Sequence, residues 1–397
     1  MLAILIVGAA SASAQTPAAP APPRPPLVLT VSWDSAPHNI STARNFQTLF
    51  ELYGRGADAL YEKASLFDRG ARGVIARLAR APLDAYVAWL ASVAGHEFGH
   101  CQQAWFAGSR ECHWVSAPGP YALGHVISIG DFGQLSPAGR QASTAGGTLA
   151  SVVGADSLKR EMFEAGHAGW TAAPLLAFRQ FDISLYGLTS PSPAEAGPLD
   201  YANDMTNYAA RYGSRSGRGG EAVHDAIVRG AWWNAADPLT WSATYGYFAR
   251  YVVRGERTAR VPGVALGGRR WMVTTSAWLS EVGVRQSLGI LSRGSAGDMV
   301  EITPSWGEQQ PALAVRWSRT VSSGLQATIS ADVWRQRTSA APGPLNTGGS
   351  FAAAVSRAFG RVRIAGDVGY KSAGAMLTRP HQAGWFFAVG TSVVVTR

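Results

Sequence analysis

Charge is scarce in this sequence. Charged residues make up 15% of its 397 residues and hydrophobic residues 47%, whereas ordinary soluble domains carry roughly 25% charged residues. A chain of this length can bury a full core and form two structural regions. Its low charge indicates that not all of its surface needs to face water.

Lysine is rarer still, because the only lysines are Lys63, Lys159 and Lys371. The formal net charge of +9 therefore comes almost wholly from arginine. A basic excess suits anionic lipid or lipopolysaccharide, although a compositional bias toward arginine explains it equally well. The sequence has no dense basic run and no nucleic-acid-binding module, so we expect no nucleic-acid partner.

Long hydrophobic runs are also missing. The uncharged stretch 85–95 is too short to cross a bilayer alone. Residues 1–14 combine a short apolar core with the A-x-A-like site Ser11-Ala12-Ser13-Ala14, although no basic residue precedes the core. We expect a signal peptide over 1–14, a Pro/Ala-rich linker over 15–26, and export to a bacterial-type cell envelope, in the outer membrane or the periplasm.

Cysteine occurs only twice, as Cys101 and Cys112. An exported chain meets an oxidising compartment, where two cysteines this close in sequence favour a local disulfide. A second metal site built from Cys112 and His113 is the weaker interpretation.

The pattern of apolar residues divides the chain into two regions. Residues 27–237 are mainly helical, with apolar residues repeating at three and four over 41–80 and Pro82 suited to the first turn of the next helix. Residues 238–397 alternate with period two. The predicted strands lie at 241–253, 270–278, 281–291, 298–306, 312–320, 325–333, 349–359, 361–370 and 383–396.

The fold class predicted from this division is α+β, with an antiparallel sheet or β-barrel of about 8–10 strands following the helices. Many predicted strands run about ten residues, the length of a tilted membrane strand. Seven of the 14 Trp fall in this region. We favour an outer-membrane-type barrel or partial barrel, and therefore membrane association, over a soluble sandwich or barrel.

The motif that points to chemistry is His96-Glu97-Phe98-Gly99-His100, an H-E-x-x-H sequence at the end of an apolar, helix-patterned run. On a helix, residues four apart share one face, so His96 and His100 can hold one zinc ion. Glu97 beside them is placed to take a proton from water. Two histidines and a glutamate on a solvated helix face are the alternative.

A zinc site of this kind needs a third protein ligand. We favour Asp204, because it lies in the helix-like run 203–207, where a carboxylate can be aimed rigidly. Asp200 is the choice if the family resemblance described next holds, and Asp156 follows a close-packing glycine segment. Glu161 or Glu164 would suit the general zincin pattern. The other acidic or imidazole candidates downstream are His167 and Glu195.

Three segments together resemble the site-2-protease type of intramembrane metalloprotease. They are the HExxH block at 96–100, Ala145-Gly146-Gly147-Thr148-Leu149-Ala150-Ser151, and Pro198-Leu199-Asp200. The resemblance covers about residues 83–205 and implies a zinc peptidase in which the later aspartate, Asp200, completes the site. The strand-rich C-terminal half has no counterpart in that family.

The function predicted from these features is a zinc-dependent hydrolase of the cell envelope, a metallopeptidase that acts on a peptide or protein substrate. Its ligands would be His96, His100 and Asp204, with Glu97 as general base. The alternatives are a non-enzymatic outer-membrane β-protein in which the motif is structural, and an envelope protein that binds metal without hydrolysis.

Overall fold

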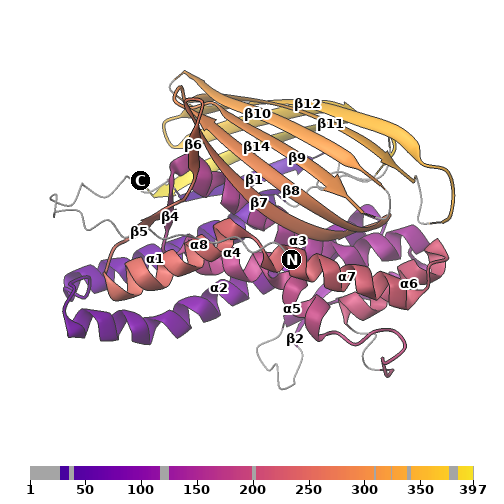
Figure 1. Cartoon of the computed structure of the whole chain (residues 1–397), viewed down its shortest axis with the longest axis horizontal. Helices are drawn as coiled ribbons and strands as arrows, with labels where there is room; N and C mark the ends of the chain where they lie inside the picture. Colours follow the sequence, from indigo (N-terminus) through magenta and orange to yellow (C-terminus); the bar gives the residue numbers. More distant parts are fainter. Residues whose placement is uncertain are drawn as a thin grey trace.

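The computed structural model describes residues 27–34, 40–116, 125–198, 203–307, 310–322, 324–337, 341–374 and 383–396. The expected signal peptide (1–14) and linker (15–26) lie outside this range, as does Asp200. The described residues confirm the α+β class, with helices in the first half and an antiparallel sheet in the second (Figure 1).

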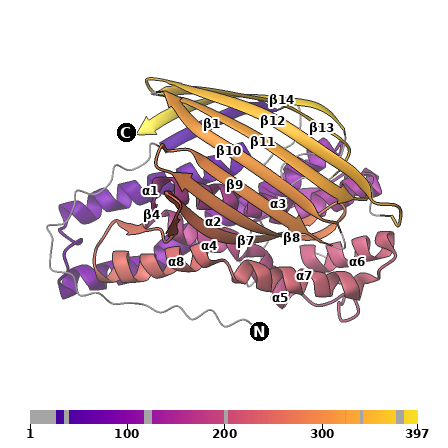
Figure 2. The same ribbon diagram turned by 45° about the horizontal axis from the view of Figure 1, so that its top comes forward.

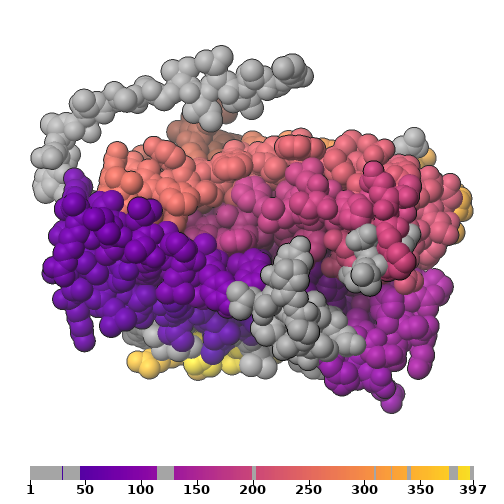
Figure 3. Space-filling model, turned by 90° about the horizontal axis from the view of Figure 1, so that it is seen from below, coloured from indigo at the N-terminus to yellow at the C-terminus, as the bar shows by residue number. Residues whose placement is uncertain are grey.

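The helices form one layer, which Figure 3 shows from below. Within the described residues, no helix combines the length and the apolar character that crossing a membrane requires. The helical elements are α1 (Ile40–Lys63), α2 (Ala71–Phe106), η1 (Phe132–Gln134), α3 (Pro137–Ala165), α4 (Ala172–Gln180), α5 (Asp182–Thr189), α6 (Asp204–Ser216), α7 (Gly220–Ala235), α8 (Pro238–Gly246) and the π-helix η3 (Tyr247–Val253).

Ten strands form one antiparallel sheet in the order β1-β14-β13-β12-β11-β10-β9-β8-β7-β6. Of the forms that the sequence left open, the described strands adopt an open sheet, with β1 and β6 at its two ends. The strands are β1 (Leu27–Asp34), β6 (Val264–Leu266), β7 (Arg269–Ser280), β8 (Gly283–Gly294), β9 (Met299–Trp306), β10 (Ala312–Ser322), β11 (Leu325–Gln336), β12 (Asn346–Phe359), β13 (Val362–Lys371) and β14 (Gly384–Thr396).

Two small two-stranded sheets complete the fold. β2 (Cys112–Ser116) pairs with β3 (His125–Ile129), and β4 (His167–Gly169) pairs with β5 (Thr258–Arg260). The predicted disulfide is confirmed: Cys101 in the last turns of α2 bonds Cys112 at the start of β2, with a Cα–Cα distance of 5.6 Å. It ties the end of the motif helix to the following hairpin.

The predicted strand at 241–253 is wrong, because this segment is helical (α8 and η3). The Asp237 side chain accepts a hydrogen bond of 2.7 Å from the backbone N–H of Thr240, and Pro238 follows at the first helical position. Four of the residues that α8 and η3 bury are spaced at four, namely Leu239, Ala243, Tyr247 and Tyr251. Alternating aromatic residues in the same stretch hid this helical spacing.

Pro82 does not begin a helix, because α2 runs through it without interruption. A proline inside a helix removes one backbone hydrogen bond and leaves the carbonyl one turn earlier unpaired. Pro82 is exposed here, as are Leu78 and Leu83. Water can therefore reach the carbonyl that the proline leaves unbonded, which lowers the cost of continuing the helix.

Helix α3 is the central element, lying between α2 and the sheet. Its apolar side packs Leu158, Met162 and Phe163 against Leu291 of β8 and Met299 of β9. Its other side meets α2 at glycine: a Cβ on Gly99 would lie 2.3 Å from the Gly146 carbonyl oxygen. The two helices can approach this closely only because both positions lack a side chain, and this contact brings α3 up to the histidines.

Candidate metal centre

The motif histidines lie one turn apart near the end of α2 and are nearly covered. Their side chains are 4% and 8% exposed, and their ring centroids are 4.8 Å apart. Both Nε2 atoms point toward α3 at Gly147, where a Cβ would lie 2.4 Å from each of them. Gly147 therefore leaves the space in which the two imidazoles converge.

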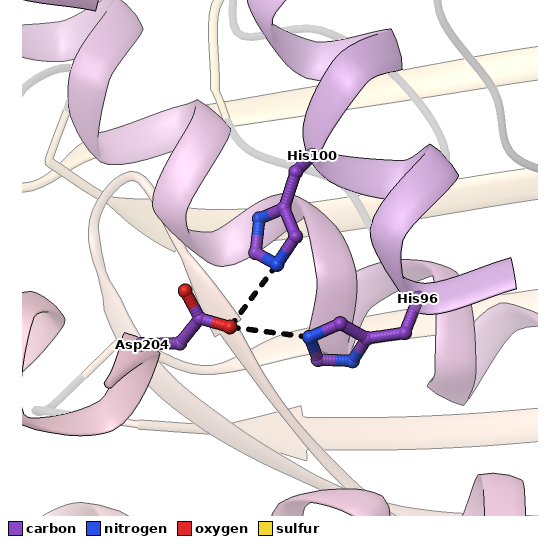
Figure 4. Close-up of side chains that lie close together, drawn as sticks. All are labelled: His96, His100 and Asp204. Atoms are coloured by element: carbon purple, nitrogen blue, oxygen red, sulfur yellow. Dashed lines mark hydrogen bonds and ion pairs between the residues drawn. The ribbon is translucent and has the colours of Figure 1, made fainter. Parts of the chain in front are cut away.

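The third member of the site is Asp204, the first residue of α6. The Asn203 side chain caps this helix by accepting hydrogen bonds from the backbone N–H groups of Met205 (2.9 Å) and Thr206 (3.4 Å). Asp204 Oδ2 lies 3.1 Å from His96 Nε2 and 3.0 Å from His100 Nε2 (Figure 4). The predicted ligand set is thus brought together.

Each histidine is held at its other ring nitrogen. His96 Nδ1 lies 2.9 Å from Asp182 Oδ2, and His100 Nδ1 lies 2.7 Å from the Ser143 carbonyl oxygen. A carbonyl oxygen only accepts, so His100 carries its proton on Nδ1, and the Asp182 carboxylate favours the same tautomer for His96. Both Nε2 atoms are then directed into the cluster, the orientation that metal ligation requires.

The charges of the site are strongly coupled. Burial lowers the pKa of His96, but the Asp182 carboxylate outweighs it and holds that pKa well above its usual value. The pKa of His100 is likewise lowered by burial and raised further by Asp204. Burial raises the pKa of Asp204, yet His100 and His96 hold it well below its ordinary range. Asp204 is therefore an anion, the form that binds a cation.

Glu97 and Tyr186 border the cluster. Glu97 is 9% exposed, and its charge raises the pKa values of His100 and Tyr186, which places it in the same electrostatic environment. The Tyr186 ring stacks on His96 with centroids 5.6 Å apart and an interplanar angle of 12°. The charge of His96 lowers the pKa of Tyr186, but burial and the nearby carboxylates raise it to about 12, so its hydroxyl keeps its proton.

The other candidates that fall within the described residues lie outside this cluster. Asp156 pairs with Lys159 (3.1 Å) and Glu161 accepts from Gln47 (2.9 Å). Within the described part of the chain, the only cluster of this kind consists of His96, His100 and Asp204. The candidates that this cluster does not include are Asp156, Glu161, Glu164, His167 and Glu195.

Sequence reasoning missed Asp182 and Tyr186 as site residues. Both lie on α5, four positions apart and therefore on one face of that helix. An acidic residue opening a helix is usually a favourable partner of the helix dipole, so Asp182 gave no separate signal. Its role depends on α5 lying beside α2, which no local pattern predicts.

The donor set fits zinc. Two imidazole nitrogens and one carboxylate oxygen lie within 4.8 Å of one another, and three protein ligands with an open fourth position define catalytic zinc sites. The Asp204 side chain is 24% exposed, far more than either histidine. Among the three residues, Asp204 is therefore the most accessible to solvent.

No protein-family model, curated protein or solved structure matches this chain.

Proposed function

We propose that this protein is a zinc-dependent hydrolase, and specifically a metallopeptidase of the HExxH type. The observation that carries the proposal is the convergence of His96 Nε2, His100 Nε2 and Asp204 Oδ2, with both Nδ1 atoms held by separate acceptors. A histidine pair on a solvated face would be exposed and would need no such second set of partners.

His96, His100 and Asp204 would hold the ion in this proposal. The chemistry that zinc supplies at such sites is Lewis acidity, which acidifies water and polarises a carbonyl group. The residues of the chain orient the donors and shield them from bulk water. Burial of the imidazoles strengthens every electrostatic interaction within the site.

Glu97 is the general base in this proposal. It accepts a proton from the attacking water and passes it to the leaving amine as the peptide bond breaks. Its position next to His96 on α2 and its low exposure support this role, because a partly desolvated carboxylate is a stronger base than a solvated one. Tyr186 keeps its hydroxyl proton and is available as a hydrogen-bond donor to the substrate.

The resemblance to site-2 proteases gains support from the helix that carries Gly146 and Gly147. That helix packs directly against the HExxH helix, with Gly147 next to both imidazoles. The ligand in this chain would be Asp204 instead of the Asp200 that the resemblance implies. We propose, on the sequence features alone, that the protein is exported to the cell envelope and acts there on peptide or protein substrates.

The test compares the wild-type protein with Glu97→Gln on a fluorescence-quenched peptide library, with zinc content measured on the same samples. We expect one zinc ion per chain in both proteins and a loss of hydrolysis on the order of 100-fold or more in Glu97→Gln. Glu164→Gln on α3 is the matched control and should keep full activity. Stoichiometric zinc with no hydrolysis by the wild-type protein would instead identify a metal-binding protein.

A further inference from the structure

The ten-stranded sheet has one face toward the helices and one face away from them. Met299 and Glu301 of β9 point to the helices, where Met299 packs in the core with α3 and Glu301 accepts from Arg160 at 2.8 Å. Side chains alternate along a strand, so Ile302 points the other way. Direct cross-strand pairing extends this second face through Ile302, Val315, Ala331, Phe351, Tyr370 and Trp385, one residue each from β9 to β14.

No described helix covers this outer face of β10–β14 (Figure 2), and its exposed side chains are mostly apolar. The side chains on it that are 51–67% exposed include Ile329, Phe351, Val355, Val368, Trp385 and Val389. The alternate positions on the inner face include Ser330, Asp332, Ser350 and Asp367. A water-facing sheet shows the opposite arrangement, with polar residues outside and apolar residues inside.

The charges on the outer face lie only near its margins. Across β10–β14, the charged residues at outer-face positions of the described strands are Arg319, Arg335 and Arg357, and none is acidic. Arg357 pairs with Leu325 at one end of β11, and Arg335 lies at the other end. The eleven residues from Leu325 to Arg335 are joined by ten intervals and span roughly 33 Å along the strand, or roughly 23 Å across the band at a tilt of about 45°. Membrane β-proteins carry an apolar band of about 25 Å.

The backbone of these strands is also suited to a medium without water. Each of β10 to β14 pairs with a neighbour on both sides, β14 with β13 and β1. Their peptide groups therefore lie in hydrogen-bonded ladders, which a hydrocarbon environment demands. At the margin, Trp385 contacts Phe351 and Tyr370 at centroid distances of 6.0 and 5.5 Å. Aromatic clusters of this kind favour the boundary between hydrocarbon and headgroups.

We propose that the outer face of β10–β14 lies against the hydrocarbon of a lipid bilayer, with Arg319, Arg335 and Arg357 at the level of anionic headgroups. Arginine at both margins and the absence of acidic residues on this face complement an anionic lipid surface. The inference does not depend on the metal centre or on hydrolysis.

The test is flotation of the full chain with phosphatidylcholine vesicles, with and without phosphatidylglycerol. We expect the wild-type protein to float, and Ile329→Glu/Val355→Glu/Val368→Glu to lose vesicle binding by on the order of tenfold for each buried charge. These positions are exposed to water in the free protein, so the variant should fold, and circular dichroism checks this. Arg319→Gln/Arg335→Gln/Arg357→Gln should lose only the preference for phosphatidylglycerol.

The matched control places three glutamates on exposed apolar residues of the helical layer, as Leu60→Glu/Trp232→Glu/Tyr245→Glu. It should float like the wild-type protein. Equal binding by the wild-type protein and the sheet variant would overturn the proposal, and so would an equal loss in the control. A wild-type dimer that ignores vesicles and becomes monomeric in the sheet variant would also overturn it, because the face would then join two copies of this chain.

A labelling experiment checks the same contact directly. Both native cysteines are in the disulfide, so a cysteine introduced at Val355 is the single free thiol for an environment-sensitive fluorophore. With vesicles, we expect the fluorophore emission at this position to shift to the blue and to be quenched by brominated lipid. Neither change is expected for the fluorophore on Ser214→Cys in α6. An unchanged spectrum at position 355 in the presence of vesicles contradicts the proposal.

Discussion

At the scale of single residues, the candidate site depends on the partners of the two imidazoles. Asp182 holds His96 through a charged hydrogen bond, whereas His100 is held by the Ser143 backbone carbonyl. The Nδ1 partner of His96 is therefore a side chain, whereas that of His100 is a backbone group. Only the partner of His96 can be changed without replacing a backbone group.

Asp182→Asn should weaken zinc binding by about 10- to 100-fold, because a carboxylate that orients a ligating histidine and raises its basicity is lost. The measurement is competition for zinc against a fluorescent chelator. Asp225→Asn on the exposed side of α7 is the control and should bind like the wild-type protein. An unchanged zinc affinity in Asp182→Asn would show that Asp182 does not support the site.

Gly147→Ala should damage the site while leaving the helix intact. The new methyl group would lie 2.4 Å from both Nε2 atoms, so the imidazoles must move apart. Hydrolysis should fall on the order of 100-fold, as for displacements of about 1 Å in other active sites. The matched control is Gly56→Ala in α1, where the methyl group meets nothing within 4 Å. The control should keep its activity and gain up to about 1 kcal/mol of stability. Full activity in Gly147→Ala would contradict the assigned geometry.

Glu51 gives a prediction for pH dependence. Burial raises the pKa of Glu51 from 4.5 to about 7. The folded state therefore holds a proton that the unfolded state has released, and the free energy of unfolding should fall as pH rises from about 4.5 to about 7. The full difference corresponds to about 3 kcal/mol. Glu51→Gln should flatten this decline in urea unfolding measured across that range, and Glu164→Gln should not. An equally steep decline in Glu51→Gln would refute the assignment.

At the scale of elements, the edge of β7 that has no strand partner is the point where helices and sheet are joined. β6 pairs only with residues 269–271 of β7. Beyond them, side chains of the helical layer bond the backbone of β7. Asn234 Oδ1 accepts from the Ala277 N–H at 2.6 Å, Asp237 Oδ2 accepts from the Thr275 N–H at 2.8 Å, and Gln180 donates to the Thr275 carbonyl at 2.9 Å. The edge is thus satisfied without another strand.

Asn234→Ala should cost roughly 2–4 kcal/mol, because it leaves the buried N–H and C=O groups of Ala277 without their partner. Urea unfolding measures the loss, and the dependence on urea concentration should stay unchanged. Ser214→Ala on the exposed face of α6 serves as the control. A loss below about 0.5 kcal/mol, as for ordinary surface positions, would mean that water replaces the amide at this edge.

Elements with a clear local pattern could be predicted from the sequence, whereas features that depend on tertiary packing could not. All eight strands predicted from residue 270 onward are present, because apolar and polar residues alternate over much of these segments. The strand predicted at 241–253 is wrong because alternating aromatic residues masked the helical spacing of four. The motif predicted His96 and His100, and the helix-like context predicted Asp204. The roles of Asp182 and Tyr186 could not be predicted in this way, because they depend on the packing of α5 beside α2.

At the scale of the whole molecule, the first and the last described strands are neighbours in the sheet. β1, from before the first helix, pairs antiparallel with β14 at the end of the chain, from Leu27–Thr396 to Asp34–Ala388. Residues 27–34 fall in the region predicted to be mainly helical, because eight residues carry no signal for a partner more than 350 positions away. Segments from both ends of the chain thus lie side by side in the sheet that covers one side of the helices (Figure 1).

The central claim is a zinc ion held by His96, His100 and Asp204. Zinc K-edge X-ray absorption of the purified protein, together with Asp204→Ala, tests it most directly. The account predicts one zinc ion per chain with two imidazole nitrogens at about 2.0–2.1 Å and a carboxylate oxygen at about 2.0–2.2 Å, and loss of the oxygen ligand or of the metal in Asp204→Ala. A protein without stoichiometric zinc, or a zinc spectrum without imidazole scattering, would contradict it.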